Sequence, residues 1–319
     1  MVRIGIVGIG GMGTVHYHNY LHLEGCQVVG VVARSADGQA KAAQWQVPCF
    51  ASIQEMVRQV PLDVIDICTP TYLHKEQVMQ ALSLGKHTIV EKPCALCRAD
   101  AQAMFEKAEE MGVQLYVAQV LQFTREIQVL RRLVREQTYG KPLDALFQRL
   151  SARPEWAQGG WLFDREKSGL IPFDLHIHDL DIIVSLFGPP QSSTCHVSGE
   201  GDVPELYRWE YRCGEVNVAA EAGWLKASIP FTARWRVYFQ RGVVWYDGEK
   251  VTAYPYQGKP VVFDTEETIK IPTGINVPPT GWYWSELGHF LACIREGKPS
   301  QLVPKEQVLA VLGTLENNP

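Results

Sequence analysis

The chain has 319 residues, of which 46% are hydrophobic and 20% are charged, a balance typical of a globular protein long enough for two domains. The net charge of −5 argues against a general nucleic-acid binder, which needs a basic face to neutralise phosphates. No apolar run approaches the ~20 residues of a membrane span, and the N-terminus lacks the pattern of a signal peptide. We therefore expect a cytoplasmic protein that binds neither nucleic acid nor membrane.

The eight cysteines are scattered along the chain, as expected for small buried side chains in a reducing compartment. Cys94 and Cys97 form a C-x-x-C pair, which also occurs in redox centres and as one half of a zinc site. No second such pair follows at the spacing of a zinc finger. We therefore expect no bound metal.

The first part of the chain alternates expected strands and helices. The strands are expected over Arg3–Val7, Val28–Ala33, Pro48–Phe50, Val64–Cys68, Thr88–Val90 and Gln114–Val117, and helices over Gln39–Gln46, His74–Leu84 and Arg98–Met111. Such alternation predicts an α/β domain whose doubly wound parallel sheet carries helices on both faces.

The second part of the chain has a different pattern, with period-two alternation along several strands. Helices are expected over Glu126–Gln137, Asp174–Leu186, Ser285–Glu296 and Lys305–Leu315, and strands over Tyr207–Cys213, Val216–Ala220, Arg234–Gln240, Val243–Tyr246 and Val251–Tyr254. In the first of these strands, tyrosine, tryptophan and cysteine face one way and charged residues the other. The pattern predicts a largely antiparallel sheet with one face packed on helices.

A glycine-rich turn follows the first expected strand in the sequence VRIGIVGIGGMGTVH. Gly8, Gly10 and Gly13 have the spacing G-x-G-x-x-G, in which they allow a tight turn, close approach of a pyrophosphate, and helix–strand packing. The new helix would present its N–H groups to the phosphates. Ordinary loops also contain such glycines, but the strand over Val28–Ala33 completes a βαβ unit of about 30 residues. The stretch therefore predicts a dinucleotide site.

The end of the second strand bears on the choice of dinucleotide. NAD sites usually place an acid there, for the ribose hydroxyls, whereas this chain has Ala33, Arg34 and Ser35. Asp37 lies too far along and is better interpreted as the cap of the next helix. An arginine beside a hydroxyl suits a 2′-phosphate, so the sequence predicts NADP(H), with NAD possible.

Two more loops follow expected strands on the edge where open parallel sheets bind ligands. The sequence CTPTYLH over residues 68–74 can border the cofactor; alternatively it is a proline-containing turn capped by Thr71. Glu91 and Lys92 precede Pro93, which holds the lysine in extended backbone and directs its ammonium group. Alternatively this lysine is simply solvated.

A third stretch, DLHIHDLD, places an acid and a histidine at helical spacing. Asp174 and His178 are four residues apart, so they share a helix face, and the carboxylate can orient the imidazole as a general base. One alternative is that Asp174 caps the start of the helix and serves only as the hydrogen-bond partner of His178. Another is a metal cluster with His176 and Asp181, which is weakened because His176 lies about 200° round the helix from Asp174.

Together these stretches resemble the glucose–fructose oxidoreductase, inositol dehydrogenase and rhizopine-catabolism (Gfo/Idh/MocA) family over nearly the whole chain. The landmarks GIVGIGGMGTVH, CTPTYLH, ALSLGKHTIVEKP, DLHIHDLD and WSELGHFLACIREGKP occur in that family's order. The resemblance implies a Rossmann domain over residues 1–121. It also implies an α+β domain over residues 122–319, with a large, mostly antiparallel open sheet that serves substrate binding and oligomer contacts.

The resemblance further implies that Lys92, Asp174 and His178 form the catalytic group. Two departures concern the substrate pocket: the usual glycine pair before the catalytic helix reads Ser168-Gly169, and Gln122 stands where such proteins often carry arginine. The identity of the substrate therefore does not carry over.

These observations predict an NAD(P)-dependent dehydrogenase or reductase of a secondary alcohol or ketone, on a small-molecule sugar or cyclic polyol, and a homodimer or homotetramer. One alternative is a glycosidase that oxidises its substrate transiently; another is a dinucleotide-sensing regulator without chemistry. The predicted cofactor-binding residues are Gly8, Gly10, Gly11, Met12, Gly13, Arg34, Ser35, Thr69, Pro70, His74, Glu91 and Lys92.

Overall fold

The computed structural model describes all residues except 156–157, 201–202, 276–277 and 318–319, together with the side chains of 158–159. Its contacts divide the chain into two compact units. Unit 1 comprises Met1–Phe123 and Glu267–Lys305, and unit 2 comprises Thr124–Glu266 and Glu306–Pro319. The first division falls two residues beyond our predicted boundary, and residues 267–305, which we assigned to the second domain, group with the first unit by contacts.

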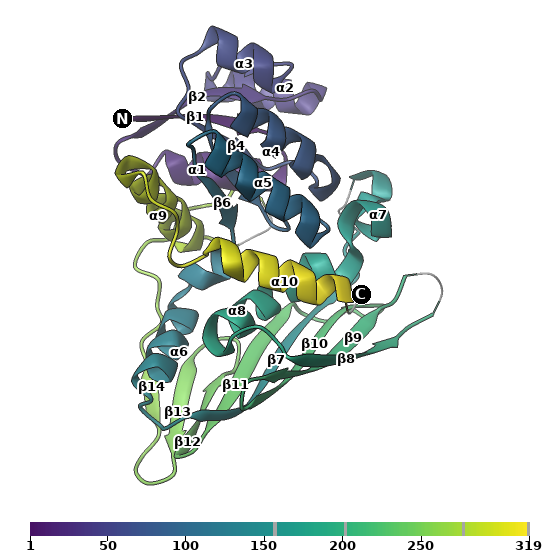
Figure 1. Cartoon of the computed structure of the whole chain (residues 1–319), viewed down its shortest axis with the longest axis vertical. Coiled ribbons are helices and arrows are strands. Elements are labelled where there is room, and N and C mark those ends of the chain that lie inside the picture. Colours follow the sequence, from purple (N-terminus) through teal and green to yellow (C-terminus); the bar gives the residue numbers. More distant parts are fainter. Residues whose placement is uncertain (156–157, 201–202, 276–277, 318–319) are drawn as a thin grey trace. The chain divides into compact units, whose positions relative to one another are not determined.

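Unit 1 is built on a six-stranded parallel sheet in the order β3-β2-β1-β4-β5-β6 (Figure 1). The strands are β1 (Val2–Val7), β2 (Cys26–Val32), β3 (Cys49–Phe50), β4 (Val64–Ile67), β5 (His87–Glu91) and β6 (Leu115–Ala118). The strand order reverses between β1 and β4, which is the switch point where such sheets bind ligands. The predicted doubly wound sheet is confirmed.

The helices of unit 1 lie between these strands and, in one case, far along the chain. They are α1 (Gly11–Tyr20), α2 (Ala36–Trp45), α3 (Ile53–Gln59), α4 (His74–Ser83), α5 (Arg98–Glu110) and α9 (Trp282–Glu296), with short 3₁₀ turns η1 (Thr71–Leu73) and η2 (Val120–Phe123). Gly85 and Gly112 follow α4 and α5 with φ of +68° and +65°, a backbone that glycine adopts without strain. Both helices therefore end where their glycines predict.

Unit 2 contains an eight-stranded sheet in the order β14-β13-β12-β11-β7-β10-β9-β8, in which only the β7–β10 pair is parallel among the described strands. The strands are β7 (Pro142–Ala152), β8 (Ser192–Ser198), β9 (Leu206–Cys213), β10 (Val216–Leu225), β11 (Thr232–Phe239), β12 (Gly242–Tyr246), β13 (Val251–Pro255) and β14 (Val261–Phe263). The predicted large, mostly antiparallel sheet is confirmed.

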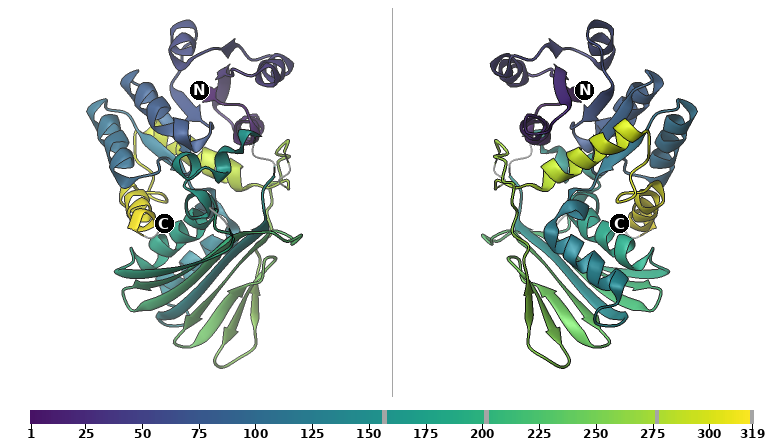
Figure 2. Two further views of the ribbon diagram at one scale, coloured as in Figure 1. Left: turned by 90° about the vertical axis from the view of Figure 1, so that its right-hand side faces the viewer. Right: turned by 90° about the vertical axis from the view of Figure 1, so that its left-hand side faces the viewer.

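The helices of unit 2 are α6 (Arg125–Glu136), α7 (Arg165–Ser168), a π-helical turn η4 (Pro172–His176), α8 (Ile177–Phe187) and α10 (Lys305–Asn317), with a 3₁₀ turn η3 (Gln158–Phe163). Helix α8 packs on β7 and β10, and Figure 2 shows α6 and α8 on the same face of the sheet. In the part of unit 2 that the structure describes, no helix covers the opposite face, which we call the open face (Figure 2).

The alternation predicted for β9 is confirmed, because Tyr207, Trp209 and Tyr211 are buried and the charged residues between them are exposed. The central strand β7 was not predicted, because its pattern is misleading. Arg149 points into the core, where it forms a bidentate pair with Asp179 of α8, with N–O distances of 3.0 and 2.7 Å. A buried arginine breaks the apolar alternation from which a strand is recognised.

Within the described residues, no helix is long and apolar enough to cross a bilayer.

Candidate active site

The glycine turn between β1 and α1 uses each glycine for a different reason. Gly8 has φ +83°, and a Cβ there would lie 2.7 Å from Thr69 Cγ2. A Cβ on Gly13 would lie 2.0 Å from the carbonyl oxygen of Gly8, so the helix packs directly on the turn. A Cβ on Gly10 would meet nothing within 4 Å. The turn therefore leaves open space only beside Gly10 among these three, where the motif brings a pyrophosphate close to the backbone.

The first turn of α1 is available to an anion. Gly10 is its N-cap residue and contributes no side-chain hydrogen bond, and the first turn contains no acidic side chain. Gly11 and Met12 open the helix, and Met12 packs against a small apolar cluster that includes Val15. Backbone N–H groups and the helix dipole at such an end favour phosphate. These residues fit the diphosphate of a dinucleotide.

The end of β2 carries the groups expected to choose between NAD and NADP. Arg34 and Ser35 are exposed, and Ser35 Oγ accepts a hydrogen bond from Gly38 N at 3.1 Å. Ser35 is thus the N-cap of α2, and our assignment of the cap to Asp37 was wrong; Asp37 lies in the first turn. A serine takes this role because its oxygen reaches the N–H three residues on, while Asp37 already has helical backbone.

One residue near this point was missed by sequence reasoning. Lys41 of α2 places its Nζ 3.0 Å from the carbonyl oxygen of Ile9 and 2.8 Å from Thr14 Oγ1, beside the glycine turn. Its ammonium also lies 5.9 Å from the centre of the Trp45 ring. A lysine in the second turn of a surface helix carries no sequence signal of its own, since its role depends on how α2 packs beside the glycine turn.

The loops after β4 and β5 are joined by a buried histidine. His74 has one ring nitrogen 2.7 Å from the carbonyl oxygen of Thr69 and the other 2.8 Å from that of Pro93. The ring is 1% exposed, and burial lowers the pKa of His74. Thr69 also donates its hydroxyl to Gln77 Oε1 at 2.6 Å. His74, predicted as a cofactor ligand, thus lies where it holds both predicted loops together, and Pro70 lies in the first of them.

Glu91 and Lys92 end β5 in different environments. Glu91 is 7% exposed and its Oε1 lies 3.1 Å from Nε2 of His16, inside the sheet layer. Its Oε2 accepts a hydrogen bond from the backbone N–H of Lys92 at 3.1 Å. Lys92 is half-buried. The carboxylate of Glu91 therefore supports the backbone of the lysine.

Asp174 and His178 stand out by their exposure within unit 2. From Ser168 to Val184 every residue is buried except these two, which are half-buried. Asp174 lies in the π-helical turn η4, and His178 lies in the first turn of α8. Either winding keeps residues four apart within about 40° of one another round the axis. The two side chains thus share the part of this segment that is turned away from the core.

Two residues of the alternative metal cluster make other contacts in the structure. His176 is fully buried, stacks on Trp209 with ring centres 3.8 Å apart, and has its Nε2 2.8 Å from the Tyr211 hydroxyl. Burial lowers its pKa to about 3. Asp181 accepts a hydrogen bond from Gln307 at 2.7 Å. These contacts hold His176 and Asp181 within the core of unit 2.

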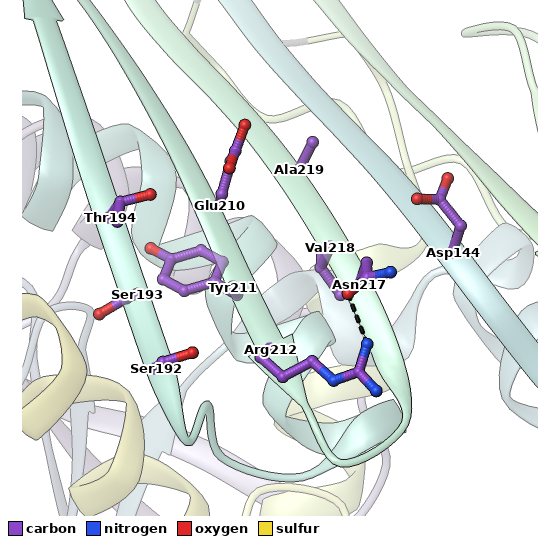
Figure 3. Close-up of a pocket in the computed structure, with 10 residues that line it drawn as sticks. All are labelled: Asp144, Ser192, Ser193, Thr194, Glu210, Tyr211, Arg212, Asn217, Val218 and Ala219. Carbon is purple, nitrogen blue, oxygen red and sulfur yellow. Dashed lines mark hydrogen bonds between the residues drawn. The ribbon is translucent and has the colours of Figure 1, made fainter.

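A hollow of about 440 Å³ lies on the second sheet, on the ends of β7, β8, β9 and β10 (Figure 3). Asp144, Thr194 and Glu210 line it, and the Arg212 guanidinium donates to Asn217 Oδ1 at its edge, at 2.6 Å. None of the predicted catalytic or cofactor residues lines it. We associate it with the open face of the sheet and not with the chemistry.

The parallel sheet and its glycine turn define a dinucleotide-binding protein with a second α+β unit. Comparison with known families agrees and is more specific. Residues 2–119 match the "Oxidoreductase family, NAD-binding Rossmann fold" model of GFO/IDH/MocA proteins, and residues 127–244 match the GFO/IDH/MocA C-terminal domain. The two matches cover more than half of the chain, which belongs to the Gfo/Idh/MocA family, as its landmarks predicted.

Individual relatives are distant. The chain is 27% identical over 199 residues to 2,7-anhydro-N-acetylneuraminate hydratase of Escherichia coli K12, covering 62% of this chain and 53% of that protein. It is 29% identical over 186 residues to 1,5-anhydro-D-fructose reductase of Ensifer adhaerens, covering 57% and 56%. The match thus spans about half the length of these curated relatives.

Likeness in three dimensions extends further along the chain. An oxidoreductase from Agrobacterium radiobacter, solved in complex with NAD⁺, L-tartaric acid and magnesium, superposes with a TM-score of 0.87. The match covers 99% of this chain and 95% of that one, at 15% sequence identity. At such identity the likeness shows the fold alone.

Proposed function

We propose that the protein is an NAD(P)-dependent oxidoreductase that interconverts a secondary alcohol and a ketone on a sugar or cyclic polyol. The observation that carries the proposal is the exposure of Asp174 and His178 together on an otherwise buried segment. An acid and an imidazole kept accessible in this way suit proton transfer. The glycine turn supplies the dinucleotide site, and both curated relatives described above are named for anhydro-sugar substrates.

The proposed chemistry divides between three side chains. When bound, the nicotinamide ring supplies the two-electron redox step at the substrate carbon. His178 takes the proton from the substrate hydroxyl during oxidation and returns it during reduction. Lys92 donates a hydrogen bond to the same oxygen and stabilises its developing negative charge. Asp174 orients the His178 ring and favours its protonated form.

Under this proposal, substitution of a catalytic residue should lower turnover without weakening dinucleotide binding. His178→Ala should keep dinucleotide affinity within a few-fold, while kcat falls by about 10²–10⁴, the loss expected for a general acid–base. Lys92→Ala should behave alike through lost charge stabilisation, and Asp174→Asn should do less and shift the pH–rate profile. The measurements are fluorescence titration with NADPH and steady-state kinetics on a panel of sugars, polyols and their keto forms.

His22→Ala serves as the matched control, because His22 is an exposed histidine whose ring contacts the His18 carbonyl oxygen in α1. It should leave both measurements unchanged. Near-full turnover by His178→Ala, or loss of its dinucleotide binding, would contradict the roles assigned to these residues.

For the cofactor we propose a preference for NADP(H) over NAD(H). Arg34 and the Ser35 hydroxyl stand exposed at the end of β2, and the Lys41 ammonium lies close by at the glycine turn. Two cations and a hydroxyl suit a 2′-phosphate. Arg34→Ala should raise the dissociation constant for NADPH by about tenfold or more and that for NADH little. A clear preference of the unmodified protein for NADH would refute this choice.

A second candidate is a reaction without net redox change, in which the substrate is oxidised, altered and reduced again with the dinucleotide retained. The E. coli relative is named a hydratase, which favours this candidate. The same residues would play the same roles in both candidate reactions. The two reactions therefore differ in whether the dinucleotide is consumed. Product that accumulates from an anhydro sugar without added dinucleotide, and without change in absorbance at 340 nm, would support the second candidate over the first.

We also propose that the open face of the second sheet joins copies of the chain into a homodimer or homotetramer. Its strand register aligns Tyr238 with Val243 and Tyr254 in one row, and Arg236 with Trp245 in the next. Tyr238, Trp245 and Tyr254 are each nearly half exposed. Apolar patches of this kind tend to be covered by a partner.

Light scattering tests the assembly. Trp245→Glu should shift the oligomer toward monomer, whereas the equally exposed Val197→Glu on β8 serves as a control that should not. A monomeric unmodified protein at micromolar concentration would refute the assembly.

We place the protein in the cytoplasm, which accords with its eight free cysteines.

A further inference from the structure

Buried polar side chains form a network between α1 and the parallel sheet of unit 1. His16 of α1 has its Nδ1 2.8 Å from Asp66 Oδ2 and its Nε2 3.1 Å from Glu91 Oε1. The Tyr20 hydroxyl donates to the same Asp66 oxygen at 2.8 Å. His16 and Asp66 are fully buried, and Glu91 is nearly so. Carboxylates this deep in a protein require a partner, because burying an unpaired charge is costly.

The geometry indicates that the His16 ring is an imidazolium. Both of its nitrogens face carboxylate oxygens, so both must donate, and a neutral imidazole has only one N–H. Burial opposes the charge, yet Asp66 and Cys68 together outweigh the effect of burial, and the pKa of His16 lies well above its usual value. The groups that face the ring are Tyr20 from α1, Asp66 from β4, Cys68 directly after β4, Glu91 from β5 and Tyr283 from α9.

The network leads to the proposed catalytic lysine. Glu91 uses one carboxylate oxygen for His16 and the other for the backbone N–H of Lys92, at 3.1 Å. His16 itself lies on the helix that starts at the glycine turn. One chain of contacts therefore runs from the dinucleotide-binding helix through the imidazolium and the Glu91 carboxylate to the Lys92 backbone.

We propose that His16 is a positioning residue for Lys92. By holding the Glu91 carboxylate in one orientation, it fixes the backbone from which the lysine side chain projects, and it ties that backbone to the helix that binds the dinucleotide. The proposal rests on the proposed function for the role of Lys92 itself, but not for the contacts. A misplacement of about 1 Å at a catalytic group can cost about 10²-fold in rate, which sets the scale of the expected effect.

A metal site is the main rival explanation for this network. One ligand atom each from His16, Asp66 and Cys68 lie within 4.8 Å of one another. A bound zinc would need the Cys68 thiolate and a neutral His16 nitrogen. Burial, however, raises the pKa of the Cys68 thiol, and both His16 nitrogens already have carboxylate partners. Elemental analysis of the purified protein that found stoichiometric zinc, lost in Cys68→Ala, would overturn the proposal.

Hydrogen exchange tests the contacts without requiring catalysis. In His16→Gln the Lys92 amide should exchange about tenfold faster or more, because its Glu91 acceptor is no longer held. Glu91→Gln tests the same link from its other end and retains the Asp66–His16 pair, should His16→Gln fail to fold. Tyr20→Phe is the matched control: it removes a buried hydrogen bond to Asp66 and should leave Lys92 exchange unchanged. Unchanged Lys92 exchange in the folded His16 or Glu91 variant would overturn the proposal.

Kinetics test the consequence. His16→Gln should lower kcat by about 10- to 100-fold while KM and the dissociation constant for NADPH stay within about threefold, a split that general loosening of the fold would not produce. Tyr20→Phe should retain kcat. Equal losses in Tyr20→Phe and His16→Gln would assign His16 a purely structural role. If Lys92→Ala proves fully active while exchange responds as expected, the proposed function fails and the positioning contact stands.

Discussion

Gly10 and Gly13 offer a matched pair of substitutions, since the same added methyl group meets different surroundings. A Cβ at residue 13 would lie 2.0 Å from the Gly8 carbonyl oxygen. Carbon–oxygen contacts stand about 3.3–3.6 Å apart, so Gly13→Ala must move the turn by more than ~1 Å. Overpacking usually costs about 1–3 kcal/mol, and here backbone must shift, so we expect about 3 kcal/mol of unfolding free energy to be lost. Gly10→Ala meets nothing within 4 Å and should change stability by less than about 0.5 kcal/mol.

For dinucleotide binding, we expect the larger effect from Gly10→Ala and not from Gly13→Ala. In Gly10→Ala the methyl group occupies the space that the pyrophosphate needs, so the dissociation constant for NADPH should rise about 10- to 100-fold, or about 1.4–2.8 kcal/mol. Gly112→Ala is the control: its φ is +65° with nothing within 4 Å, so it should cost about 1–2 kcal/mol through backbone strain and leave binding unchanged.

Urea unfolding followed by tryptophan fluorescence gives the stabilities, and quenching by NADPH gives the affinities. A Gly10→Ala protein that binds NADPH like the unmodified protein would refute the assignment of this space to the pyrophosphate. A Gly13→Ala protein of unchanged stability would refute the packing argument for the turn.

Further predictions concern unit 2. Asp179→Asn leaves the buried Arg149 guanidinium without its anion and should lower the free energy of unfolding by about 3–5 kcal/mol in urea, whereas a loss under 1 kcal/mol would contradict the pairing. His176, with a pKa near 3 in the fold and about 6.5 when unfolded, binds its proton mainly in the unfolded chain. Stability should therefore fall as pH drops from 6.5 toward 3, by up to about 4 kcal/mol from this group. His176→Phe should flatten that dependence, and an equally steep acid transition in this variant would contradict the buried neutral ring.

The sequence predicted what depends on local pattern and failed where partners come from elsewhere in the chain. The parallel sheet, the glycine turn and the alternation of β9 follow from spacing that neighbouring residues set among themselves. β7 was missed because Arg149 takes an inward position that only Asp179, thirty residues on, makes tolerable. The cap of α2 was misplaced by two residues, since serine and aspartate both suit that role.

The candidate site shows the same division. Gly8, Gly13 and the shared face of Asp174 and His178 could be read from spacing. The network of His16, Asp66 and Glu91 could not, although one signal was present. Asp66 is the single acid within the apolar strand VIDI, and a buried acid in such a strand requires a cation from another element.

The π-helical turn Pro172–His176 has a consequence for how this chain could change. A π turn is an α-helix with one extra residue accommodated in it. Deleting one residue between Asp174 and His178 would convert the turn to regular α-helix without rotating the segments on either side of it. The two residues would then be three apart, about 60° from one another round the axis, and residues three apart still face one another on a helix. The shared face of Asp174 and His178 thus tolerates the loss of one residue from this turn, although the distance between their side chains would change.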